Sequence, residues 1–179
     1  INPDLELWIG ALERLNKAGL TKLAAIHRGF SSFEKGPFRN ARMWDMAIEL
    51  KTRIPELDIL CDPSHIAGNR ELISFISQKA LDLDMVGLMI ESHIDPDAAW
   101  SDAKQQVTPA VLGRIVEGLV VRSVSSDNKT FKDTLSILRE QIREGSTVAK
   151  ALRKASPSFD DLYCNLTAAG EVTGSCHIV

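Results

Sequence analysis

Short apolar segments alternate with longer amphipathic segments along the first part of the chain, and this alternation constrains the fold more than any other feature. Apolar runs of strand length lie at 22–27, 58–61 and 86–90, and each is followed by residues whose apolar positions recur with helical spacing. Strands separated by helices at intervals of roughly 30 residues indicate parallel βαβ units. The sequence therefore predicts an α/β fold, either a TIM barrel or a doubly wound sheet, because periodicity does not distinguish the two.

Capping and turn residues predict where these elements begin and end. Asn2 suits the start of a first helix that ends at Gly19, and Thr108 suits the start of the last helix in this region. The segments 62–68 and 91–107 are expected to be loops. The predicted order is α-β-α-β-α-β-α.

The composition changes after this α/β region. Residues 122–128 read RSVSSDN and are expected to be a linker, and the rest of the chain is expected to be helical. Helical segments are predicted at 131–138, 148–152 and 162–169. The predicted units are a partial barrel, a linker with one helix, and a helical tail, at 1–122, 123–142 and 143–179. We expect the tail to pack separately from the α/β part, or only loosely upon it.

Composition and charge argue against several classes of protein. The formal net charge of -3 and the pI near 5.8 do not suggest the clustered basic face of a nucleic-acid-binding protein. The three cysteines form no CxxC pair, which argues against a disulfide framework or a zinc knuckle and favours a cytoplasmic location. No apolar run reaches the roughly 18 residues needed to cross a bilayer, so no membrane span is expected. The first residue is Ile1 rather than Met, which suggests a fragment or a processed product.

Polar side chains follow each predicted strand, at the edge where ligands collect in parallel α/β folds. His65 follows the second strand, and Glu91 and Asp102 follow the third. One imidazole and two carboxylates form a mixed nitrogen and oxygen set that suits a divalent ion such as Mn²⁺, Fe²⁺ or Zn²⁺. Taken singly, the polar residues of these loops are better explained by structure: Asp62 as a turn former before Pro63, His65 as a hydrogen-bonded loop histidine, and Asp95-Pro96-Asp97 as a turn or helix cap. Their coincidence at successive strand ends favours a metal site.

The loop after the first strand carries three cationic residues, Arg28, Lys35 and Arg39. A guanidinium group binds phosphate oxygens in a bidentate fork, so these residues suit a phosphorylated substrate beside the metal. The residues alone therefore define a phosphate-binding α/β domain whose reaction is unknown.

Four motifs carry a resemblance to a known enzyme family: AAIHRG at 24–29, EKGPFRN at 34–40, CDPSHIAGNREL at 61–72 and GLMIESHIDPDAAWSDAKQQ at 87–106. Over about residues 2–142 the chain resembles the type I beta 3-deoxy-D-arabino-heptulosonate-7-phosphate (DAHP) synthases, most of all the bacterial forms fused to a chorismate mutase. The resemblance implies the last three strands, with their helices, of a TIM barrel. It also implies condensation of phosphoenolpyruvate with erythrose 4-phosphate, the entry step of aromatic amino-acid biosynthesis.

The resemblance assigns roles to individual residues. The implied ligands of a divalent metal (Mn, Fe, Zn or Co) are His65, Glu91 and Asp102. This metal would polarise the aldehyde of erythrose 4-phosphate, so that C3 of phosphoenolpyruvate attacks it while water adds at C2. Arg28 would bind phosphoenolpyruvate, and Lys35 and Arg39 would be further anion contacts.

Two groups of the family's active site are not among these residues, namely a fourth metal ligand, which is a cysteine from an early strand, and a lysine. Cys61 is expected to be a small buried residue and not that ligand. The resemblance therefore implies a DAHP synthase fragment that is inactive alone. Three strands without the rest of a barrel would leave unpaired edges, through which the chain could self-associate.

The end of the chain carries a second resemblance. Residues 144–174, with the motifs LYCNL and AAGE, resemble a cytoplasmic segment of the inner-membrane platform proteins of type II secretion and type IV pilus assembly. Such a join suggests a chimera, an artificial sequence or a misassembled reading frame. Because this stretch holds no catalytic set, the alternative function that its resemblance implies is a non-catalytic helical interaction module. Cys176 and His177 make a poor metal site, and a disordered end is expected there.

Overall fold

The computed structural model describes most of the chain. The described residues are 2–33, 36–120, 129–157, 161, 164–165, 167–168 and 176–177. Lys35 and the predicted linker at 122–128 lie outside them. The helix predicted at 162–169 is described only at positions 164–165 and 167–168, all of which are helical.

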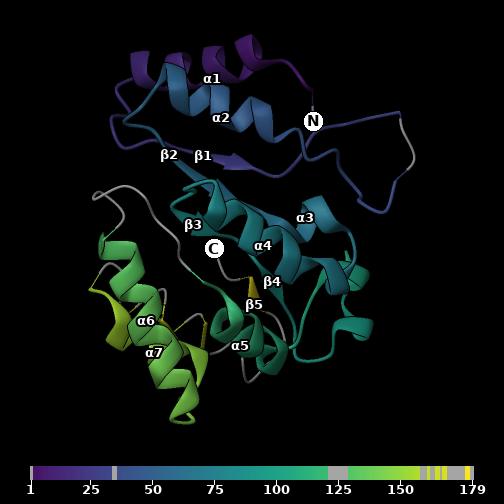
Figure 1. The fold of residues 1–179 in the computed structure, drawn as a ribbon, viewed down its shortest axis with the longest axis vertical. Helices are drawn as coiled ribbons and strands as arrows, with labels where there is room; N and C mark the ends of the chain where they lie inside the picture. Colours follow the sequence, from purple (N-terminus) through teal and green to yellow (C-terminus); the bar gives the residue numbers. More distant parts are fainter. Residues whose placement is uncertain are drawn as a thin grey trace.

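Three parallel strands form a sheet, and helices follow them along the chain, as the sequence predicted (Figure 1). The strands are β1 (Ala24–His27), β2 (Asp58–Cys61) and β3 (Gly87–Leu88), which lie in that order across the sheet. In register, His27 lies beside Cys61, and Cys61 beside Leu88, so the carboxyl ends of the strands meet at one edge. The main helices of this part are α1 (Leu5–Lys17), α2 (Trp44–Arg53), α4 (Ile73–Asp82) and α5 (Pro109–Gly118). This is the arrangement of a partial TIM barrel.

The two faces of the sheet differ in burial. The residues that point to the packed face are Ala25, His27, Ile59 and Cys61. Trp8 of α1 stacks against His27, and Trp44 of α2 contacts the same ring at a tilt, so these two helices, which lie side by side in Figure 1, cover that face. Ile26 points the other way and is 42% exposed. The face that would line the interior of a complete barrel is therefore open at β1.

Two local predictions were wrong: the residue that caps the first helix and the loop expected at 62–68. Asp4, not Asn2, caps α1, because its side chain accepts the backbone N–H of Leu7. The segment predicted as a loop at 62–68 contains a short helix, α3 (Pro63–Ala67). Asp62 caps α3, proline occupies its first position, and Gly68 ends it in a left-handed conformation at φ 63°.

The third strand is shorter than the run predicted at 86–90. β3 ends at Leu88, and a separate strand, β4 (Glu91–Ser92), begins at Glu91. The polar segment that follows is not a featureless loop, because it holds two short 3-10 helices, η2 (Pro96–Ala98) and η3 (Ala103–Gln105), and Ser92 bridges to Val107 in parallel fashion. A further 3-10 turn, η1 (Arg70–Leu72), precedes α4.

Helix α6 (Lys129–Arg143), which falls in the predicted linker-and-helix unit, forms a helical hairpin with α7 (Val148–Ala155) of the tail, and α6 lies against α5 at the end of the molecule remote from α1 (Figure 1). Val148 and Leu152 of the tail, like Leu138 of α6, are buried in the same hydrophobic core as the residues around the sheet. The prediction that the tail packs separately or only loosely is therefore wrong. The predicted boundaries of the three units stay a prediction.

A two-residue strand, β5 (Cys176–His177), pairs antiparallel with β4, where a disordered end was expected. In this register His177 lies across from Glu91. Of the helices in the described part of the chain, none combines the length and the apolar character needed to cross a bilayer.

Candidate metal centre

The segment Asp62-Pro63-Ser64-His65, directly after β2, brings the side chain of His65 close to Glu91 of β4. Asp62 is the first residue after β2, and its Oδ1 accepts the backbone N–H of His65 at 3.0 Å, which fixes His65 in the first turn of α3. Ser64 Oγ accepts the backbone N–H of Glu91 at 3.0 Å. This bond holds β4 against α3, so that His65 and Glu91 face each other.

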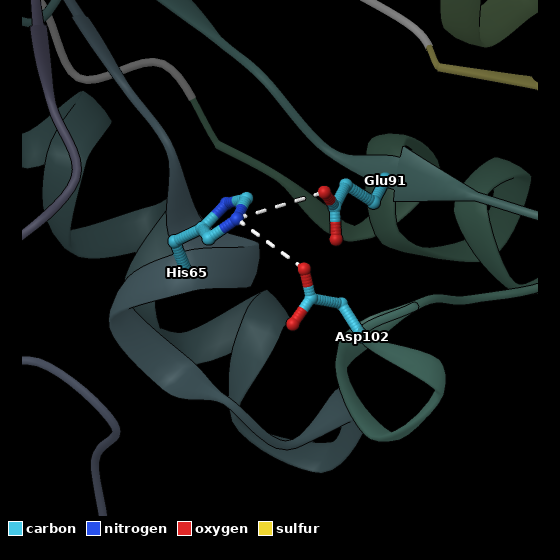
Figure 2. A group of neighbouring side chains, drawn as sticks. All are labelled: His65, Glu91 and Asp102. Atoms are coloured by element: carbon cyan, nitrogen blue, oxygen red, sulfur yellow. Dashed lines mark ion pairs between the residues drawn. The ribbon is translucent and has the colours of Figure 1, made fainter. Parts of the chain in front are cut away.

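Three predicted residues converge at this point (Figure 2). His65 Nε2 lies 3.7 Å from Glu91 Oε1 and 3.9 Å from Asp102 Oδ2. One ligand atom from each residue falls within 4.8 Å of the others. All three side chains are partly buried, with 14% of the His65 side chain, 18% of Glu91 and 30% of Asp102 exposed. The geometric convergence expected from the sequence is confirmed.

Each of these side chains has a further partner at the atom that does not face the other two. His65 Nδ1 lies 2.7 Å from Asp62 Oδ2, an ion-pair distance, although the ring N–H points too far from the oxygen for a regular hydrogen bond. Gln105 Nε2 donates to Glu91 Oε2 at 2.8 Å. Arg39 Nη1 donates to Asp102 Oδ1 at 2.6 Å. The atoms that face one another are therefore His65 Nε2, Glu91 Oε1 and Asp102 Oδ2.

This donor set fits a divalent cation. Two atoms that each bind an ion at about 2.1 Å in tetrahedral directions are separated by about 3.4 Å, close to the separations between His65 and the two carboxylates. At 3.7 and 3.9 Å these groups are too far apart to be hydrogen-bonded to one another. A mixed imidazole and carboxylate set suits Mn²⁺, Fe²⁺, Co²⁺ or Zn²⁺ better than Ca²⁺ or Mg²⁺.

The backbone at Asp102 supports a functional role for this loop. Asp102 has φ 52° and ψ 26°, a left-handed conformation that is uncommon outside glycine, although aspartate is among the residues that tolerate it. Residues held in such conformations cluster at ligand sites. The conformation lets the Asp102 carboxylate reach His65 immediately before η3 begins.

The predicted anion contacts lie in different environments. Arg28 Nε is 3.7 Å from Asp62 Oδ2, and Asn40 Nδ2 donates to the carbonyl oxygen of Arg28, so Arg28 stands next to the residue that holds His65. Arg39 is not free, because its Nη1 is shared between Asp102 and Gln105 Oε1, both at 2.6 Å. Lys35 is outside the described residues.

Sequence reasoning treated Asp62 only as a turn former and did not single out Gln105. Asp62 is 4% exposed and Gln105 is 2% exposed, so both are buried polar groups with functional neighbours. A signal for both existed, because each lies inside a quoted motif, DPSH or SDAKQQ. As expected, Cys61 is a buried residue of the strand, and burial raises the pKa of its thiol.

Comparison with known proteins gives two matches along the chain. Residues 113–177 match the signature of the family described as "Type II secretion system (T2SS), protein F". The type IV pilus assembly protein PilC of Myxococcus xanthus is 40% identical over 60 residues, which are 34% of this chain and 14% of that protein. PilC of Pseudomonas aeruginosa is 37% identical over 49 residues, which cover 27% of this chain and 13% of PilC.

The larger match covers the α/β part. Residues 5–122 match the signature of the DAHP synthetase I family. Phospho-2-dehydro-3-deoxyheptonate aldolase of Thermotoga maritima is 29% identical over 113 residues, which are 63% of this chain and 33% of that enzyme. The crystal structure of this DAHP synthase superposes with a TM-score of 0.56 at 30% identity over 64% of this chain and 33% of that one, and its truncated form with a TM-score of 0.55 at 30% identity over 63% and 42%. The chain thus spans about a third of the length of the curated aldolase that it matches. With two thirds of its residues inside the larger match, and with the barrel strands of that enzyme, the chain belongs to the DAHP synthetase I family.

Proposed function

We propose that this chain supplies the metal-binding portion of a DAHP synthase, which condenses phosphoenolpyruvate, erythrose 4-phosphate and water to DAHP and phosphate. The observation that carries the proposal is the convergence of His65, Glu91 and Asp102 from α3, β4 and the loop before η3. The family generally uses a divalent metal, and these three residues would hold it. The proposal places this reaction in aromatic amino-acid biosynthesis in the cytoplasm.

The chain's own residues would prepare the site in two ways. Asp62, next to His65 Nδ1, favours a proton on that nitrogen, which leaves the lone pair of Nε2 directed at the two carboxylates. The Arg28 side chain is 44% exposed beside Asp62, so its guanidinium is accessible to the phosphate of phosphoenolpyruvate. When bound, a divalent cation supplies Lewis-acid polarisation of a carbonyl oxygen.

The test is Mn²⁺ binding to the 179-residue chain, measured by calorimetry and by electron paramagnetic resonance (EPR). His65→Ala, Glu91→Gln and Asp102→Asn should each weaken binding by more than about tenfold, because each removes a ligand atom or its charge. Asp97→Asn is the matched control, because Asp97 is an exposed carboxylate that pairs with Arg70 instead. Equal binding by all these variants would refute the metal site.

The match of residues 113–177 favours a second candidate function, a helical interaction module that binds a component of a secretion or pilus system. Ile137 on α6 is 42% exposed and lies within this match, so its side chain is accessible to a partner helix. Ile137→Glu should abolish capture of such a component, whereas His65→Ala should leave it intact. Loss of capture in both variants, or in neither, would argue against this module.

A further inference from the structure

Two side chains outside the ligand set connect the candidate ligands to one another. Arg39 Nη1 donates to Asp102 Oδ1 and to Gln105 Oε1, each at 2.6 Å. Gln105 Nε2 donates in turn to Glu91 Oε2 at 2.8 Å. We refer to this chain of hydrogen bonds, from Asp102 through Arg39 and Gln105 to Glu91, as the Arg39–Gln105 relay.

We propose that Arg39 and Gln105 are positioning residues that set the direction of the Glu91 and Asp102 carboxylates for a divalent cation, an inference that rests on the proposed function. Each carboxylate has one oxygen held by the relay, while its other oxygen faces His65 Nε2 at 3.7 or 3.9 Å. Free rotation of either carboxylate would exchange these two oxygens. The relay prevents that exchange, so each carboxylate presents one defined oxygen to the ion.

Glutamine is the residue type that this position requires. Its amide offers an acceptor and a donor on the same planar group, so Oε1 accepts from Arg39 while Nε2 donates to Glu91. Gln105 is 2% exposed, and the loss of either partner would leave a buried polar atom unsatisfied, at a cost well above that of a surface contact. The orientation of the amide is therefore determined by its two partners.

The relay is anchored to the helix that carries His65. The backbone N–H of Arg39 donates to the carbonyl oxygen of Ala67 at 3.2 Å, so the segment that bears Arg39 lies along the end of α3. At the same place Gly68 passes so close that a β-carbon on it would lie 2.4 Å from Arg39 Cβ. All three candidate ligands are thus held relative to one helix.

A simple charge argument makes the opposite prediction, which makes the inference testable. Arg39 is a cation beside a cation site, so Coulomb repulsion alone implies that its removal strengthens Mn²⁺ binding. If Arg39 acts by positioning, its removal weakens binding, because Asp102 and Gln105 lose their partner. The sign of the change in affinity distinguishes the two explanations.

The experiment measures the Mn²⁺ dissociation constant and the EPR spectrum of bound Mn²⁺ for the whole chain and for Arg39→Met, Arg39→Lys, Gln105→Met and the Arg39→Met/Gln105→Met double variant. Arg39→Met and Gln105→Met should each weaken binding by about 10- to 100-fold and broaden the spectrum, the range found when partners of metal ligands are removed. The double variant should bind about as weakly as the weaker single variant, because the relay acts as a unit. Arg39→Lys should stay weaker than wild type, because an ammonium keeps the charge but not the planar fork.

Arg53→Met is the matched control, because Arg53 is a similarly exposed arginine that pairs with Glu6 and Glu49 on α1 and α2, and its binding should equal that of wild type. Urea unfolding of each metal-free variant separates lost positioning from lost folding. If Gln105→Met does not fold, the Arg39 variants decide the question, because the Arg39 side chain is 48% exposed. Unchanged or tighter binding by Arg39→Met, with binding lost in His65→Ala, would overturn the relay alone. Absence of Mn²⁺ binding by wild type would overturn both the relay and the proposed metal site.

Discussion

His27 should make the stability of this protein depend on pH, and replacing it with leucine should remove that dependence. The imidazole is fully buried at the end of β1 among the rings of Trp8, Phe30 and Trp44, at centroid separations of 6.4, 5.7 and 4.9 Å. Among the described residues neither ring nitrogen has a hydrogen-bond partner of regular geometry, and the Arg42 backbone nearby only partly offsets the burial. Burial lowers the pKa of His27 from 6.5 to about 4.

The size of the effect follows from this difference in pKa. The pKa of His27 falls from 6.5 to about 4 on folding, and each pKa unit is worth about 1.4 kcal/mol. The free energy of unfolding should therefore be about 3 kcal/mol higher above pH 6.5 than below pH 4 on account of this residue. Because the unfolded chain binds the proton more readily than the folded one, this contribution is fully present above pH 6.5. It decreases as the pH falls through the window down to about 4, and about 2 kcal/mol of it should be lost by pH 5.

The assay is urea unfolding at pH 7.5, 6 and 5, followed by circular dichroism, for wild type, His27→Leu and a His93→Leu control. His93 lies in the loop after β4, where its Nδ1 accepts the backbone N–H of Asp95. The change in packing caused by leucine is the same at every pH, so it cancels when the wild-type and variant pH profiles are subtracted. The difference between His27→Leu and wild type should shift in favour of the variant by about 2 kcal/mol from pH 7.5 to pH 5. Parallel profiles for wild type and His27→Leu would refute the reasoning.

Three further predictions concern the relay, the tail and catalysis. Gly68→Ala should lower the free energy of unfolding by about 1–2 kcal/mol in urea titrations, because it strains a left-handed residue, and should weaken Mn²⁺ binding by displacing Arg39, whereas unchanged binding would contradict the close approach. Leu152→Ala should lower the free energy of unfolding by about 2–4 kcal/mol. All three tryptophans precede residue 101, so tryptophan fluorescence reports the α/β part, and its unfolding transition should shift with this substitution. An unshifted transition would show that the tail unfolds separately. The chain alone should release phosphate from phosphoenolpyruvate and erythrose 4-phosphate at least about a hundredfold more slowly than a version extended with the rest of the barrel. Robust turnover of the unextended chain with Mn²⁺, abolished by His65→Ala, would instead show that an oligomer rebuilds the site.

The strands were predictable from sequence because their apolar runs are short and bounded by breakers, and β2 occupies the predicted positions 58–61. Helix α3 was missed because its five residues are too few to show helical periodicity. Its signals are chemical instead: a capping Asp62, a proline in the first turn and Gly68 at the end. Short helices at strand ends are therefore better recognised by their caps than by their periodicity.

The candidate site was predictable in its residue types but not in its connections. His65, Glu91 and Asp102 could be proposed because parallel strands bring their carboxyl ends together. The bond from Arg39 to Gln105 joins residues 66 positions apart, and its geometry depends on how α3 and the loop after β1 pack. No local pattern encodes such a distance, so the contacts of Arg39 with Asp102 and Gln105 could not be predicted from the sequence, and its expected contact with an anion stays a prediction.

The two family matches meet in α5, and the structure shows α5 packed against α6 at this junction. The matches overlap at residues 113–122, and within this overlap Gly113 allows α6 to approach so closely that a β-carbon there would lie 3.3 Å from Ile142 Cγ2. Arg143 pairs with Glu117 at 2.8 Å across the same contact, but both side chains are largely exposed and such a pair contributes little. Buried Leu138 therefore accounts for more of the coupling between α6 and the α/β part. Deletion of residues 143–179 would leave most of α6 in place but would remove Val148 and Leu152, which are buried in the same core, so it would disturb both candidate functions at once. Surface substitutions are therefore needed to separate the two functions.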